Sequence, residues 1–85
     1  MDLTLKELGD IITIDAPLVG VYAYDDYDGD YSFCFDIRSD MGDLGTDLNA
    51  LSEEDKKWLS HRVLWMGVEM RDNEPLLRIE ITWEA

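Results

Sequence analysis

The dipeptide Asp28-Gly29, between two runs of β-forming residues, constrains the fold of this chain more than any other feature. Residues 18–24 before it and residues 31–37 after it are rich in Val, Tyr, Phe and Ile, which favour strands. Asp-Gly is typical of a type I′ turn, in which both central residues have positive φ and two antiparallel strands are joined. The sequence therefore predicts a β-hairpin over residues 18–37.

A two-residue turn also decides which side chains share a face of this hairpin. The pairs on one face would be Tyr24 with Phe33, Tyr22 with Phe35 and Gly20 with Ile37. The other face would carry Val19, Val21 and Ala23 opposite Asp36, Cys34 and Arg38. Because the first face is apolar and the second is half polar, we expect the first to form the core.

A second hairpin is predicted near the C-terminus, across the turn-forming residues 72–75. Its apolar pairs would be Met70 with Leu77, Val68 with Ile79, Met66 with Ile81 and Leu64 with Trp83. On the opposite face Glu69 would meet Arg78, a favourable pair, and Trp65 would also face away from the apolar set. The alternative is a helix that begins at Ser52 and continues to Met70, but the Val and Gly residues of this segment favour a strand.

Helices are predicted before the first hairpin and between the two hairpins. Thr4 and Glu7 have the spacing of a capping box, so a short helix should run to about Asp10, followed by extended residues 11–14. Ser52 precedes three acidic residues that suit a helix N-terminus.

We expect this central helix to end near His61, and we expect residues 38–50, which are rich in Asp and Gly, to form a long acidic loop. The predicted fold class is α+β: two antiparallel β-hairpins forming a four-stranded sheet, one central helix and a short N-terminal helix. A single compact domain spanning residues 1–85 is expected.

The charge of the chain is the feature that bears most directly on function. Twenty acidic residues against seven basic ones give a formal net charge of −13. Such a surface repels nucleic acid and anionic membranes and attracts basic proteins. Eight aspartates lie between residues 25 and 47, and Asp is a short carboxylate that suits turns and loops. The alternative is that the acidity serves solubility alone.

We predict that these aspartates bind a basic partner protein, with Tyr27 as the aromatic contact, because carboxylates pair with guanidinium groups and a ring stacks on them. The predicted partner-binding residues are Asp25, Asp26, Tyr27, Asp28, Asp30, Asp36, Asp40, Asp43 and Asp47.

No pattern in the sequence indicates an enzyme, a metal site or a cofactor. A calcium loop that began at Asp26 would need Gly and Glu at its sixth and twelfth positions, where Tyr31 and Ile37 stand. Cys34 is the single cysteine, which excludes an internal disulfide and a thiolate zinc site. His61 is the single histidine and lies in no catalytic motif. We therefore expect no catalytic residue, no metal ligand and no cofactor.

The short length, the acidity, the Asp-rich hairpin and the lack of an active-site motif resemble the small phage-encoded inhibitors of host defence, the anti-CRISPR and anti-restriction DNA mimics. The resemblance is one of composition over the whole chain, and no motif or functional residue comes with it. It implies an inhibitor that occupies the basic nucleic-acid-binding surface of a partner, without binding nucleic acid or membrane itself.

The N-terminus has no basic residue ahead of an apolar run, so no signal peptide is predicted, and we expect a cytoplasmic location, in the host cell if the protein is phage-encoded. Two alternative functions stay open. One is an immunity protein for a nuclease toxin, and the other is a small structural or assembly protein that homodimerises through its sheet.

Overall fold

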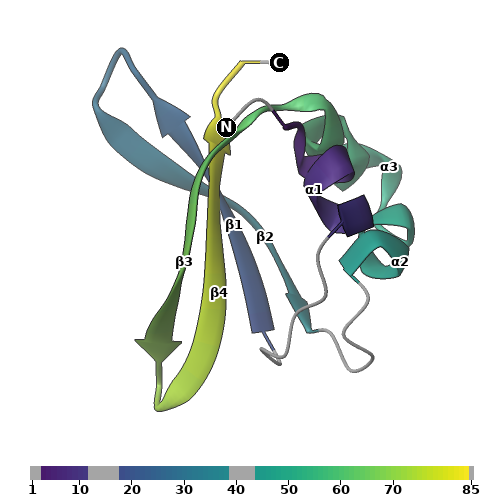
Figure 1. Ribbon diagram of the computed structural model, residues 1–85. Helices are drawn as coiled ribbons and strands as arrows, with labels where there is room; N and C mark the ends of the chain where they lie inside the picture. The colour runs from purple at the N-terminus through teal and green to yellow at the C-terminus, as the bar shows by residue number, and fades with distance from the viewer. Residues whose placement is uncertain (1–2, 12–17, 39–43, 85) are drawn as a thin grey trace.

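A computed structural model describes residues 3–11, 18–38 and 44–84 of the protein. It has an α+β fold, in which short helices cover one face of a four-stranded sheet (Figure 1). The elements in chain order are α1 (Leu5–Ile11), β1 (Leu18–Asp25), β2 (Asp30–Arg38), α2 (Leu44–Asn49), α3 (Glu53–Lys56), the 3-10 helix η1 (Lys57–Ser60), β3 (Val63–Arg71) and β4 (Glu74–Thr82). The predicted class and the four-stranded sheet are therefore confirmed.

The sheet is mixed, with the strand order β2-β1-β4-β3. Both predicted hairpins form as antiparallel pairs, but β1 and β4 run parallel in the middle of the sheet. The description as antiparallel hairpins alone was therefore partly wrong. Local turn chemistry fixes each hairpin, whereas the direction in which two hairpins join depends on how their apolar strands pack together.

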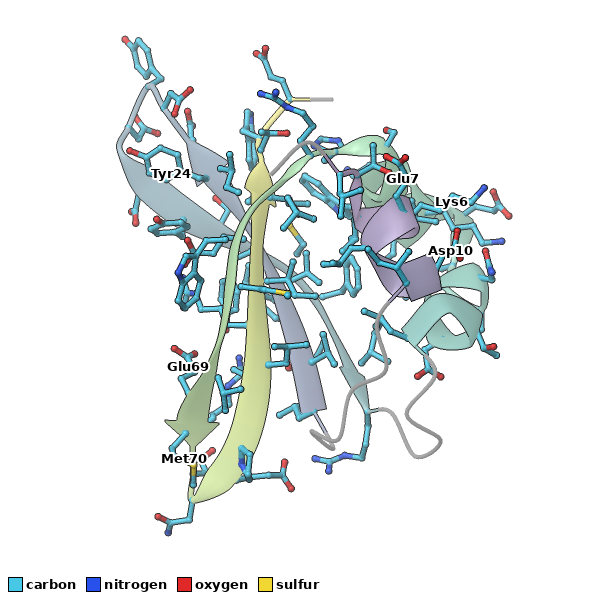
Figure 2. The ribbon with its side chains drawn as sticks, in the orientation of Figure 1. Lys6, Glu7, Asp10, Tyr24, Glu69 and Met70 are labelled. Carbon is cyan, nitrogen blue, oxygen red and sulfur yellow. The ribbon has the colours of Figure 1, made fainter. Side chains whose placement is uncertain are left out.

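The first hairpin turns the face opposite to the predicted one toward the helices. Val19, Val21 and Ala23 are fully buried in the core, whereas Tyr24 points away from the helices (Figure 2). Two local features also change the register of this hairpin from the predicted one. The loop has four residues, 26–29, instead of two, and β2 has a bulge between the pairs Val21–Phe35 and Tyr22–Phe33.

Cys34 is the extra residue of this bulge, and the residues before and after Cys34 lie on opposite faces of the sheet. Phe35 is 5% exposed and belongs to the core, while Phe33 is 57% exposed on the opposite face. A bulge inserts one residue into the alternation of a strand, so side chains beyond it change face.

The second hairpin forms as a pair of strands, so the helical alternative for residues 63–70 is wrong. Its turn is Asp72-Asn73, with φ of 52° and 65°, and the register differs by two residues from the predicted one. A shift of two keeps the alternation, so Met66 and Val68 do share a face with Leu77 and Ile79. The two-residue turn with positive φ was therefore predicted in the wrong hairpin.

The predicted ends of the helices hold in two cases. At α1, Thr4 N donates to Glu7 Oε1 at 3.0 Å and Glu7 N donates to Thr4 Oγ1 at 3.2 Å, which is the predicted capping box. At α3, Ser52 Oγ accepts from Asp55 N at 3.3 Å, and the following η1 ends at Ser60.

Two predictions about extended or loop segments need correction. The predicted acidic loop over residues 38–50 contains α2, because Leu44 and Leu48, four positions apart, pack one helical face into the core. Ile11 ends α1 instead of starting an extended segment, and residues 12–14 lie outside the described residues.

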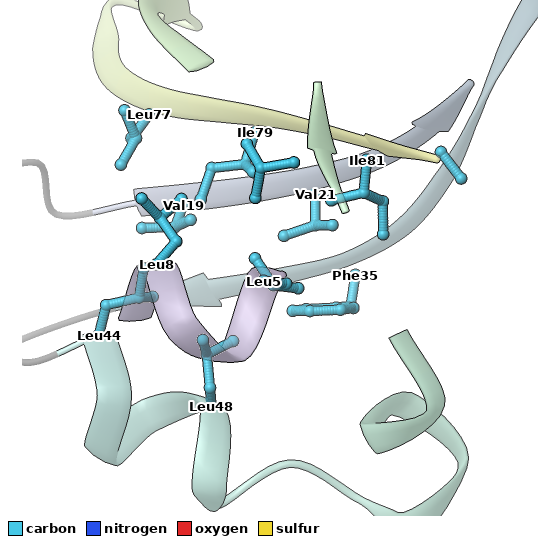
Figure 3. Packing of buried hydrophobic residues seen from close by; sticks show 12 residues of the cluster. Leu5, Leu8, Val19, Val21, Phe35, Leu44, Leu48, Leu77, Ile79 and Ile81 are labelled. Atoms are coloured by element: carbon cyan, nitrogen blue, oxygen red, sulfur yellow. The ribbon is translucent and has the colours of Figure 1, made fainter. Parts of the chain in front are cut away.

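The hydrophobic core lies between the helices and one face of the sheet (Figure 3). Its central residues are Leu5, Leu8, Leu44 and Leu48 from the helices, and Val19, Val21, Phe35, Leu77, Ile79 and Ile81 from the sheet. In Figure 1 the helices gather on this one side of the strands. The other side, which we call the open face, carries Tyr22, Tyr24, Tyr31, Phe33, Trp65, Arg78 and Glu80.

Candidate functional site

The hairpin of β1 and β2 ends in an acidic tip, defined as Asp25, Asp26, Tyr27, Asp28 and Asp30. The tip extends well away from the helices (Figures 1 and 2). Tyr27 is 95% exposed, so its ring makes almost no contact with the rest of the protein. A large apolar ring held in water at the end of a hairpin is available for contact with another molecule.

The backbone of the tip is held by hydrogen bonds of its own. Asp25 Oδ1 accepts from Tyr27 N at 2.9 Å, and Gly29 N donates to Asp25 O at 2.8 Å. Gly29 has a φ of 66°, a conformation that glycine adopts at no steric cost. Asp30 Oδ1 accepts from Tyr31 N at 2.8 Å. These bonds give the tip a defined shape without the help of a ligand.

The negative charge of the tip is not neutralised within the described part of the protein. Asp25 and Asp30 are direct cross-strand partners, an arrangement in which like charges repel. None of the ion pairs among the described residues involves a carboxylate of the tip. The repulsion within the tip would decrease if a cation of another molecule came between these carboxylates.

A groove of about 750 Å³ opens beside the acidic tip. It is lined by Tyr24, Asp25, Asp26, Tyr27, Arg62, Leu64, Thr82, Trp83 and Glu84. The main chain closes one side of it, where Trp83 N donates to Tyr24 O at 3.1 Å. The groove combines three carboxylates and three aromatic rings with a single arginine, which is the surface chemistry that binds guanidinium and ammonium groups.

The remaining predicted partner-binding residues do not join the tip. Asp36 lies near the other end of β2, where its Oδ2 pairs with Arg71 Nη1 at 2.9 Å. Asp47 belongs to α2 in the helical layer, and its Oδ2 is buried without a hydrogen-bond partner. Asp40 and Asp43 lie outside the described residues. The structure therefore places together the five residues of the tip.

Sequence reasoning missed the other half of the groove. Trp83, Glu84 and Arg62 lie far from the tip in sequence and reach it because β1 and β4 pair in parallel, with Tyr24 beside Thr82. Neither a motif nor a turn signal announces such a long-range pairing. The sequence contains no indication of it, since Trp83 was predicted to pair with Leu64 in the apolar set of the second hairpin.

The surroundings of His61 and Cys34 indicate that both side chains stabilise the fold. His61 is buried, its ring lies 5.0 Å from that of Trp58, and its Nδ1 donates to Thr82 O at 2.8 Å. Burial raises the pKa of the Cys34 thiol to about 11.

Within the described ranges, no three side chains of the His, Cys, Asp or Glu type are grouped to hold a metal ion. None of the described helices has the length and apolar character needed to cross a membrane.

Comparisons with family models, with curated proteins and with solved structures give no significant match to this chain.

Proposed function

We propose that this protein is an inhibitory binding protein, which sets its acidic tip on the basic nucleic-acid-binding surface of a partner protein and excludes nucleic acid from that surface. One observation carries the proposal. The almost fully exposed Tyr27 stands among the four carboxylates of the tip, none of which is in an ion pair with another described residue, beside a groove that adds Glu84 and the rings of Tyr24 and Trp83.

The tip gathers its carboxylates at the end of one hairpin, which suits a site that normally holds a phosphate backbone, a dense row of negative charges. Lys and Arg side chains arranged for phosphates could therefore pair with Asp26, Asp28 and Asp30 instead. Tyr27 would stack on a guanidinium group between them.

The groove adds a place for one long basic side chain of the partner. An Arg or Lys that enters between Asp25, Asp26 and Glu84 would meet carboxylates at the charged end and the rings of Tyr24 and Trp83 along its length. Such a contact fixes the orientation of the partner, whereas exposed charges mainly speed the encounter.

A pair of variants with equal charge tests the proposal. The tip variant changes Asp26, Asp28 and Asp30 to Asn, and the control variant changes three exposed acids of the helical layer, Asp10→Asn, Glu53→Gln and Glu54→Gln. Both remove three negative charges, so any effect of net charge alone is the same in the two. Asp25 is kept because its side chain accepts from Tyr27 N within the tip, and the Oδ1 of the asparagine that replaces Asp30 can still accept from Tyr31 N.

Each protein is used to capture partners from cells that carry its gene, and the affinity for the captured, purified partner is then measured at several salt concentrations. We expect the tip variant to bind at least about tenfold more weakly with a shallower salt dependence, since each lost buried pair costs about 2–5 kcal/mol. The control variant should bind like the wild type. Equal losses in both variants, or none in either, would refute a role for the tip.

A further inference from the structure

The open face of the sheet is aromatic, and none of the described helices packs against it. Phe33 is 57% exposed, Trp65 is 50% exposed and Tyr31 is 43% exposed. The rings of Tyr22 and Phe33 meet edge to face with centroids 5.6 Å apart, and those of Tyr24 and Tyr31 lie 5.0 Å apart. The rings of β1 and β2 thus contact one another instead of standing as single scattered residues, and Trp65 lies on β3 beyond Glu80 of the intervening strand β4.

The charged groups among these rings neutralise one another. Arg78 Nε pairs with Glu80 Oε2 at 2.9 Å, and Arg78 Nη1 lies 3.8 Å from Glu69 Oε1. The guanidinium carbon of Arg78 lies 4.0 Å from the ring centroid of Tyr22. Arg71 pairs with Asp36 and also donates to the Tyr22 hydroxyl. These two arginines and three carboxylates leave one net negative charge on this part of the face, a small share of the net charge of −13.

Gly67 keeps the aromatic surface flat. A Cβ atom at Gly67 would lie 2.6 Å from Cζ2 of the Trp65 indole, which is too close for any real contact. Because glycine has no side chain, the indole can lie along β3 over its backbone. The ring of Trp65 is thereby presented broadside to solvent.

We infer that the open face binds the open face of a second copy of this chain. A basic partner would be attracted by unpaired carboxylates, and on this face the carboxylates named above are paired with arginines. Nucleic acid would be repelled by the net charge. A second copy brings the same aromatic surface with its largely neutralised charges, and a two-fold dimer places one patch against itself.

The available area agrees with a weak dimer. A half-exposed aromatic side chain leaves about 100 Å² to be covered, so Tyr31, Phe33 and Trp65 of two copies supply about 600 Å². The surrounding Tyr22, Tyr24 and ion pairs enlarge this toward the roughly 1,000 Å² that a specific interface needs. The acidic tips of two copies repel each other, which further limits the affinity.

Sedimentation of the purified wild type at increasing protein and salt concentrations tests this inference. We expect the mass to rise from the monomer value of 9.8 kDa toward twice that value with protein concentration. Added salt should strengthen the dimer, because it screens the repulsion between two acidic molecules. A wild type that stays monomeric up to about millimolar concentration in both low and high salt would overturn the inference.

Two variants with exposed apolar residues on opposite faces identify the surface. One changes Phe33 and Trp65 to Ser on the open face. The control changes Val68 and Met70 to Ser. These two side chains are 68% and 64% exposed and lie on the opposite face of the sheet, the one that carries Leu77 and Ile79. We expect dimerisation to weaken at least about tenfold in the first variant and to stay unchanged in the control. The reverse pattern, or an equal effect in both, would contradict the inference.

A measurement on the wild type removes the risk that the open-face variant fails to fold. Dilution should shift the NMR signals of the Trp65 indole and of the Phe33 and Tyr31 rings, while those of Val68 and Met70 stay constant. Concentration-dependent shifts confined to Val68 and Met70 would place the contact on the other face and defeat the inference. The inference does not depend on the proposed function, since the two surfaces share only Tyr24 at their border.

Discussion

At the scale of single residues, Cys34 illustrates how one inserted residue changes the chemistry of its neighbours. As the extra residue of the β2 bulge, it packs against the core between an exposed Phe33 and a buried Phe35. The same position shields the thiol partly from water, and this burial raises its pKa to about 11. A thiol with so high a pKa carries very little thiolate, the reactive form, at neutral pH.

Alkylation of Cys34 measures this effect directly. At pH 8 we expect iodoacetamide to modify the folded protein at least about tenfold more slowly than the protein in denaturant, because less thiolate is present and access is reduced. Mass spectrometry of timed samples gives both rates. Equal rates would mean that the thiol is neither buried nor shifted in pKa.

At the scale of elements, turn and cap chemistry was readable from the sequence and strand register was not. The capping box of Thr4 and Glu7 and the helix start at Ser52 form as predicted, since each depends on residues three positions apart. Both hairpins form as well. Their registers differ from the predicted ones because each turn has another length than predicted, and the bulges at Cys34 and Leu64 then insert residues without any composition signal.

Which face of β1 packs against the helices could not be predicted from the sequence either. Tyr22 and Tyr24 are as apolar as Val19 and Val21 in a simple pattern, so alternation alone could not decide which pair faces the helices. The parallel contact with β4 decides it, and the same contact builds the groove beside the tip. The acidic tip itself was predictable, because it depends on residues close together in the chain.

The capping box predicts the effect of one substitution. Thr4→Ala removes the hydroxyl that accepts from Glu7 N and should lower the free energy of unfolding by about 1 kcal/mol. Lys6→Ala, at an exposed position of the same helix, should change it by less than about 0.5 kcal/mol. Urea denaturation of both variants measures the difference. A Thr4→Ala variant as stable as the control would show that the cap contributes nothing.

The contact between Arg38 and Glu74 predicts a pH dependence. It ties the end of β2 to the start of β4, with Arg38 Nη2 at 3.0 Å from Glu74 Oε1, and this hydrogen bond lowers the pKa of Glu74. A lowered folded-state pKa stabilises the protein above the unfolded value of about 4.3, and the stabilisation is lost as the pH falls through the folded-state pKa.

Denaturation of the wild type and of Glu74→Gln at several pH values tests that linkage. We expect the wild type to be the more stable at pH 7 and the difference to shrink as the pH falls below the ordinary glutamate pKa of about 4.3 and Glu74 becomes protonated. A difference that stays constant from pH 7 to pH 3 would show that the ion pair is not the cause.

At the scale of the whole molecule, the charge of −13 is distributed unevenly. The charges of the open face are largely neutralised by its own ion pairs, and those of the acidic tip at the end of the first hairpin are not. Salt should therefore act in opposite directions on the two proposed contacts. It should weaken binding of a basic partner at the tip and strengthen self-association through the open face.

The central claim is that the tip takes the place of nucleic acid on a basic partner, and a competition experiment tests it most directly. The captured partner is loaded with a fluorescent DNA or RNA duplex, and the wild type, the tip variant and the equal-charge control are titrated in turn while duplex release is followed by anisotropy. We predict that the wild type and the control release the duplex, with a midpoint that rises in proportion to the duplex concentration, and that the tip variant needs at least about ten times more protein. Binding of the wild type that leaves the duplex in place, or equal release by all three proteins, would contradict the claim.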